Sequence, residues 1–149
     1  MIESRRAVSA PQLHRDLDAL AAAARRAVRG RRAPLEALST YLAAQRVAAL
    51  VVDDGGCYIG ANEAACRLTG YALDELLDLS VPDLTAPEDA APGERLWNSF
   101  VRSDDQRGTF TIRRKNGTPV RVVYHAYKDI SNGIHVSFLL PADGDPPRT

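Results

Sequence analysis

The chain has 149 residues, 45% of them hydrophobic and 26% charged, which is the composition of an ordinary globular domain with an extension. No apolar run approaches the roughly 18 residues that span a bilayer. No apolar segment follows the charged start, Met1 to Arg6, so neither a membrane helix nor a secretory signal is predicted. The two cysteines, Cys57 and Cys66, lack metal or redox spacing, which favours reduced thiols and a cytoplasmic location.

Residues 1–46 are predicted to form an N-terminal helical extension. Leucines and alanines from residue 13 onward recur at alternating spacings of four and three, the pattern of a coiled-coil or bundle helix that ends near Gly30. Pro34 suits the first turn of a second helix, expected to run to about Arg46. The residues predicted to form a dimer interface are Leu13, Leu17, Leu20, Leu35, Leu38 and Leu42.

This extension is basic, since its nine arginines and four acidic residues give it a net charge of +5, balanced by −5 elsewhere. Such a segment can bind an anionic partner, or pack against an acidic face of its own domain or of a second subunit. We favour packing within the chain or a dimer. Direct nucleic-acid binding is disfavoured, because neither a helix-turn-helix pattern nor interleaved aromatic residues are present. Membrane binding is disfavoured by the lack of large apolar anchors.

Residues 47–141 are predicted to form an α+β domain. The run 47–53 is apolar and β-branched, which predicts a strand, and after an Asp-Asp-Gly-Gly turn residues 57–61 are predicted to form the returning strand. Asn62 is a suitable N-cap for a short helix ending near Gly70, and a second helical turn is expected over residues 73–77.

The second half of this domain is predicted to contain one longer helix after Pro92 and three strands. Strands 109–115 and 120–128 are joined through Asn116-Gly117, a strong hairpin pattern, and strand 134–140 follows a second turn at Asn132-Gly133. Residues 142–149, rich in Pro, Gly and Asp, are predicted to be a disordered tail.

Several short motifs then resemble those of one family. The matching residues are Asn62, Ala65, Leu68-Thr69-Gly70-Tyr71, Glu75-Leu76, Pro87-Glu88-Asp89 and Arg113-Arg114-Lys115-Asn116-Gly117. In this order and spacing, over residues 47–140, they resemble the PAS domain, a sensor module of signalling proteins. The resemblance implies a five-stranded antiparallel sheet with short helices on one face, here preceded by two N-terminal helices. One departure is Ala72, where the family usually has a capping Ser, at a cost of about 1 kcal/mol if nothing compensates.

The resemblance also bears on cofactors. Haem-binding members usually take an axial histidine from the longer helix, whereas residues 92–106 contain none and His14, His125 and His135 lie elsewhere. Flavin-binding photosensors carry a reactive cysteine in a motif that is missing around Cys66. We therefore expect no such cofactor, and leave an unknown small molecule as the candidate ligand.

His125 and His135 fall on neighbouring predicted strands, which raises the question of a metal site. Two histidines are too few for a typical zinc site, which takes three or four protein ligands. A two-residue loop at Asn132-Gly133 would place the two histidines on opposite faces of the sheet, while a longer loop would bring them together. We predict no metal site and leave their facing open.

A small-molecule pocket is expected where the family has it, between the inner face of the sheet and the helices. The residues predicted to face it are Ile59, Leu84, Trp97, Phe100, Phe110, Ile112, Val122, Tyr124, Val136 and Phe138. Trp97 and Tyr124 are the preferred ligand contacts, because each has a polar tip that needs a partner when buried. The alternative is that all ten residues simply fill the core.

The sequence contains no nucleophile–base arrangement and no phosphate-binding glycine loop, so we predict that the protein is not an enzyme. We predict a dimeric signal-transduction sensor of a small molecule or partner, acting on a kinase, cyclase or transcription regulator. The alternatives are a ligand-independent interaction or dimerisation module, and a haem- or other cofactor-bound redox or gas sensor.

Overall fold

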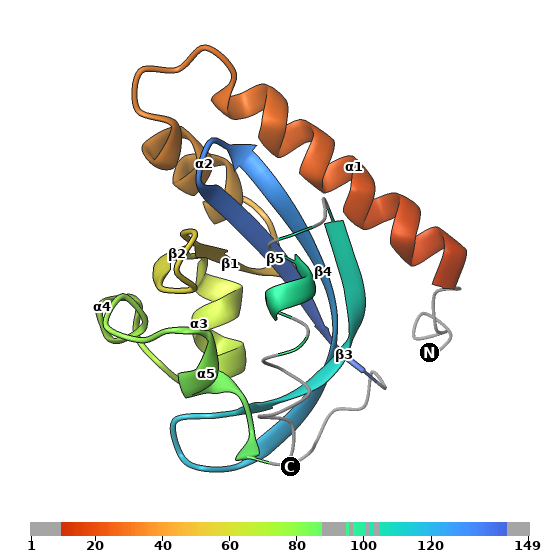
Figure 1. Ribbon diagram of the computed structural model, residues 1–149, viewed down its shortest axis with the longest axis vertical. Coiled ribbons are helices and arrows are strands. Elements are labelled where there is room, and N and C mark those ends of the chain that lie inside the picture. Colours follow the sequence, from red (N-terminus) through yellow and green to blue (C-terminus); the bar gives the residue numbers. More distant parts are fainter. Residues whose placement is uncertain (1–9, 88–94, 96, 101, 103–104, 143–149) are drawn as a thin grey trace.

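The computed structural model describes residues 10–87, 95, 97–100, 102 and 105–142, and its centre is one antiparallel sheet (Figure 1). The strand order is β2-β1-β5-β4-β3, which confirms the predicted five-stranded antiparallel sheet. The strands are β1 (Ala48–Val52), β2 (Tyr58–Ala61), β3 (Asp105–Arg113), β4 (Pro119–Ser131) and β5 (Ile134–Pro141). The predicted disordered tail lies almost wholly outside the described residues, as does much of the predicted longer helix, of which residues 97–100 are helical.

Three short helices, α3 (Glu63–Thr69), α4 (Leu73–Leu76) and α5 (Val81–Leu84), lie over one face of the sheet, here called the inner face. Asn62 caps α3 by accepting from the Ala65 N–H at 3.0 Å, and Gly70 ends it at φ 82°, a left-handed conformation that glycine adopts without strain. Both of these predicted helix ends are confirmed.

The start of α4 compensates for the missing capping side chain at Ala72. The Glu75 carboxylate accepts from the Ala72 N–H at 2.8 Å and from Lys115 Nζ at 2.6 Å. The hydrogen bond from Lys115 is the main cause of a lowered pKa for the Glu75 carboxyl. One half of a capping box therefore remains, and it ties α4 to the β3–β4 turn.

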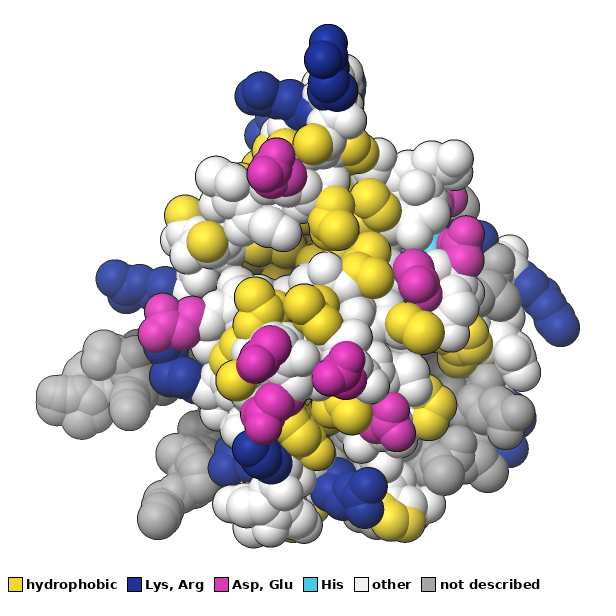
Figure 2. Space-filling view, turned by 90° about the vertical axis from the view of Figure 1, so that its left-hand side faces the viewer, with side chains coloured by type: hydrophobic (Ala, Val, Ile, Leu, Met, Phe, Trp, Pro, Cys, Tyr) yellow, Lys and Arg dark blue, Asp and Glu magenta, His cyan; other side chains and the backbone are white. Residues whose placement is uncertain are grey.

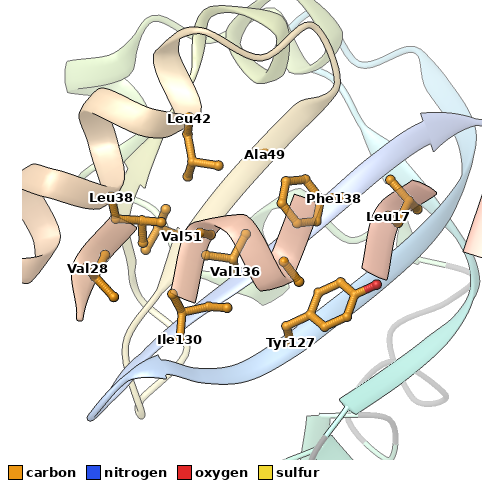
Figure 3. Packing of buried hydrophobic residues seen from close by; sticks show 12 residues of the cluster. Leu17, Val28, Leu38, Leu42, Ala49, Val51, Tyr127, Ile130, Val136 and Phe138 are labelled. Carbon is orange, nitrogen blue, oxygen red and sulfur yellow. The ribbon is translucent and has the colours of Figure 1, made fainter. Parts of the chain in front are cut away.

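Two longer helices, α1 (Ala10–Val28) and α2 (Pro34–Ala43), cover the opposite, outer face of the sheet (Figure 1). Figure 3 shows this packing, with Leu17 and Val28 from α1 against Tyr127, Val136 and Phe138 from β4 and β5. At Gly60 on β2, an added Cβ would come within 3.3 Å of the Val51 side chain on β1, so the glycine avoids a tight contact between these two paired residues. Helix α2 ends at Ala43, a turn earlier than expected.

The leucines predicted to form a dimer interface pack within the chain. Leu17, Leu38 and Leu42 are buried, and Leu13, Leu20 and Leu35 are partly buried, all in the cluster on the outer face. The spacing that resembles a coiled-coil seam equally suits a helix lying on a sheet, because both require one apolar stripe. The three buried leucines could reach a second subunit only if α1 or α2 left the sheet, whereas the other three stay partly exposed, and the dimer interface stays a prediction.

The β4–β5 turn decides how the two strand histidines face. Ser131 pairs with Ile134 across the two-residue turn Asn132-Gly133, and Gly133 has φ 76°. His125 then faces outward with Tyr127, while His135 faces inward and touches the Phe100 ring. This is the opposite-face arrangement that a two-residue loop predicts, and it rules out a site shared by these two residues.

Candidate functional site

A cavity of about 140 Å³ lies between the inner face of the sheet and the helical residues around Phe100. Its apolar wall comes from β1 (Leu50 and Val52), from Trp97 and Phe100, and from Phe110 on β3. Polar groups border it as well. They belong to Thr85, Gln106, Thr109, Tyr124, His135 and Ser137.

The structure divides the ten predicted pocket residues into three groups. Five of them, Trp97, Phe100, Phe110, Tyr124 and Val136, border the cavity. Leu84, Ile112 and Val122 are buried in the inner core without bordering it. The expectation that Ile59 and Phe138 face inward is wrong, since both pack in the outer cluster. Whether the five bordering residues contact a ligand stays a prediction.

The errors on β5 have one physical cause. Side chains alternate between the two faces of a strand, so choosing the wrong parity moves every residue to the other face. Val136 and Phe138 belong to the outer cluster, and Val136 also borders the cavity. The inward positions are His135, Ser137 and Leu139, which the sequence analysis did not select.

At one end of the cavity, Tyr124 and Gln106 form a polar pair. Gln106 Nε2 donates to Tyr124 Oη at 2.8 Å. The Tyr124 ring packs edge-on against Phe110 at 5.3 Å, and an added Cβ at Gly108 would come within 3.3 Å of that ring. Burial raises the pKa of the Tyr124 hydroxyl, although the Gln106 hydrogen bond opposes this. The hydroxyl is therefore neutral near pH 7 and held in a fixed position.

At another part of the wall, His135 connects two turns. The Asp129 N–H donates to Nδ1 at 2.9 Å, so Nδ1 accepts and Nε2 carries the proton. Nε2 then donates to Asp54 Oδ1 at 2.7 Å. Asp54 lies in the β1–β2 turn, and Asp129 lies in the irregular end of β4 with φ 53°. His135 thus clamps the two turns together beside the cavity.

Asp54, Asp129 and His135 also bring three metal-ligand atoms within 4.8 Å of one another. Both ring nitrogens of His135 are already engaged by hydrogen bonds. A metal on Nε2 would shift the proton to Nδ1, where it would oppose the Asp129 N–H. The arrangement therefore suits a structural clamp better than a metal site.

On the outer face, polar contacts hold α1 to the sheet. The Tyr127 hydroxyl donates to Asp18 Oδ1 at 2.7 Å and lies 3.1 Å from His125 Nδ1. Arg25 donates to the Lys128 carbonyl at 3.3 Å and stacks over the Tyr127 ring at 5.9 Å. The basic extension therefore packs on its own domain, which was one of the alternatives left open by the sequence.

Two residues of the site, Gln106 and His135, were not predicted from the sequence, for different reasons. Gln106 was overlooked because β3 begins at Asp105, four residues before the expected strand start. The role of His135 was not predictable, because its contact with Asp54 joins residues 81 positions apart, which local patterns do not reveal.

The chain belongs to the PAS fold family, whose model matches residues 36–139, from within α2 to within β5. No curated protein matches the sequence significantly. Within the part of the chain that the structure describes, no helix is long and apolar enough to cross a membrane.

Solved structures agree with this assignment. A domain of a sensory box sensor histidine kinase/response regulator from Geobacter sulfurreducens is 22% identical with a TM-score of 0.61, over 70% of this chain and 91% of that one. A PAS domain from Colwellia psychrerythraea is 17% identical with a TM-score of 0.62, over 72% and 95% of the two chains. A LOV protein from Rhodobacter sphaeroides is 14% identical with a TM-score of 0.63, over 72% and 65%. At these identities the likeness shows a common fold.

Proposed function

We propose that this PAS domain is a regulatory sensor in which a small molecule in the inner cavity changes how α1 packs on the outer face. Strand β4 supports this proposal, because it takes part in both sites. Tyr124 and Ala126 border the cavity, while the alternate residues His125 and Tyr127 face α1. A ligand that displaces β4 would thereby alter the contact between Tyr127 and Asp18. The two packings of α1 would be the two states that the ligand selects between.

The output of such a sensor requires a partner. Because similar folds occur in sensor histidine kinases, we propose a signalling protein of this kind as the effector, with a cyclase or a transcription regulator as alternatives. A homodimer and a cytoplasmic location stay predictions. In this proposal, release of α1 would expose the leucines of the outer cluster to a second subunit. The role is regulatory rather than catalytic.

The test is to fill the cavity permanently. An Ala126→Leu variant adds bulk at the cavity wall on β4, and amide hydrogen exchange then reports on α1. We expect faster exchange along α1, because the added side chain pushes β4 toward the outer face. The matched control is Ala43→Leu, which adds the same bulk at an exposed position of α2. Equal exchange in the two variants, with both folded, would remove the support for this function.

A second candidate function is ligand-independent docking. Leu73 and Leu77 on and beside α4 are 44% and 45% exposed, and Asp74 and Asp78 adjoin them. Figure 2 shows hydrophobic and acidic side chains side by side on this face. A partner with a basic and apolar surface would suit it. The test is the affinity for an effector in two variants. This alternative is favoured if the Leu73→Ser/Leu77→Ser variant no longer binds the effector while Ala126→Leu binds it as tightly as the wild-type chain does.

A further inference from the structure

The size of the cavity limits its ligand to about one ring. Its volume of about 140 Å³ is close to that of the engineered apolar cavity of about 150 Å³ that binds benzene. Pockets for drug-sized ligands span roughly 300–1,000 Å³. A multi-ring cofactor is therefore too large for the cavity as it stands.

The walls of the cavity favour a neutral aromatic molecule. Among the described residues that line it, none carries an Asp, Glu, Lys or Arg side chain. A charged ligand would lose its hydration there without gaining an opposite charge, which is strongly unfavourable. The rings of Trp97, Phe100, Phe110 and Tyr124 provide faces and edges against which one further ring can pack.

The Tyr124–Gln106 pair adds one specific polar contact. Because Gln106 Nε2 donates to Tyr124 Oη, the Tyr124 O–H remains a donor and Gln106 Oε1 remains an acceptor. No described residue accepts from that hydroxyl or donates to that oxygen. A group that accepts one hydrogen bond and donates another, as a hydroxyl does, would satisfy both. The packing of Tyr124 against Phe110 and Gly108 holds the pair in place before a ligand binds.

We propose that the cavity binds a small neutral phenol, a single aromatic ring whose hydroxyl accepts from Tyr124 and donates to Gln106. This inference rests on the proposed sensing function and names the ligand class of the same cavity. It assigns recognition of the ring to the aromatic walls and recognition of the hydroxyl to the polar pair.

The test is calorimetric titration of the full chain with three probes. Phenol and toluene have the same number of heavy atoms and differ in the hydroxyl, and benzoate adds a charge. We expect phenol to bind about tenfold tighter than toluene, as one well-formed hydrogen bond allows, and benzoate not to bind. Tyr124→Phe should weaken phenol binding and reduce its preference over toluene, because only the hydrogen bond to Gln106 would remain, and it should leave toluene binding unchanged. The matched control is Tyr71→Phe, which removes a hydroxyl from a half-buried tyrosine that does not line the cavity and should keep the preference for phenol.

The outcomes separate this inference from the proposed function. Equal affinity for phenol and toluene, a preference for phenol that Tyr124→Phe does not reduce, or tightest binding of benzoate would each overturn the ligand class. Failure of all three probes to bind would also overturn the ligand class. The sensor function would then be tested separately, by amide exchange in the Ala126→Leu variant. Phenol binding with the expected Tyr124 dependence but without any response in α1 would support the ligand class and contradict the sensor function.

Discussion

Substitution of Asn62 by Ala is expected to be the most damaging single change outside the apolar core. The Asn62 side chain is 4% exposed and uses its full hydrogen-bonding capacity. Its Oδ1 accepts from the N–H groups of Ala49 and Ala65, each at 3.0 Å. Its Nδ2 donates to the carbonyls of Leu42 at 3.0 Å and Val47 at 2.9 Å. One side chain thus connects the end of α2, strand β1 and the start of α3.

The expected cost follows from these contacts. Loss of an N-cap side chain typically costs about 1 kcal/mol. A buried N–H left without a partner, as at Ala49, costs about 1–3 kcal/mol more. We therefore expect Asn62→Ala to lower the free energy of unfolding by about 2–4 kcal/mol, a large share of the roughly 5–15 kcal/mol that a typical domain has.

Urea unfolding at constant m-value measures this change. The matched control is Asn116→Ala in the β3–β4 turn, where Oδ1 accepts only from the N–H and hydroxyl of Thr118 and the residue is exposed. That control should cost less than about 1 kcal/mol. If Asn62→Ala costs no more than Asn116→Ala, then the four hydrogen bonds of Asn62 do not hold α2, β1 and α3 together.

Three further changes have defined outcomes. Tyr127→Phe keeps the ring but removes the hydrogen bond to Asp18, so it should cost about 1 kcal/mol and speed amide exchange in α1; unchanged exchange would argue against this contact. The pKa of the Glu75 carboxyl is lowered mainly by Lys115, so the stability it contributes is present near neutral pH and is lost as the pH falls through that lowered pKa. Lys115→Met should therefore raise the Glu75 pKa in an NMR titration, and an unchanged value would contradict the contact. Gly70→Ala forces a left-handed alanine at φ 82° and should cost about 1–2 kcal/mol by urea unfolding, whereas no loss would mean that α3 can end differently.

Features governed by local chemistry were predictable from the sequence. The cap at Asn62, the helix end at Gly70 and the turns at Asn116-Gly117 and Asn132-Gly133 each depend on a few neighbouring residues. The five-stranded antiparallel sheet followed from the family resemblance, whereas the order of the strands within it comes from the structure. These features lie in the part of the fold made of the sheet and the short helices on its inner face.

Features governed by contacts between distant residues were not predictable. Along β5, apolar and polar residues alternate from Ile134 to Phe138, but the apolar side is the outer one, because α1 and α2 cover it. The sequence of the strand alone does not show which face those helices cover, so the facing of Phe138 could not be inferred from it. The same apolar stripe on α1 suits a partner helix and a sheet equally well. The contact of His135 with Asp54 depends on how two separate turns meet, which no local pattern encodes.

Control of α1 by the cavity is tested most directly by hydrogen exchange of the α1 amides in the wild-type chain and in Tyr124→Phe, each with and without saturating phenol. We expect faster exchange along α1 when phenol is added to the wild-type chain, and a much smaller response in Tyr124→Phe at the same phenol concentration. Identical α1 exchange with and without phenol in a wild-type chain that calorimetry shows to be occupied would contradict the claim that the cavity controls α1.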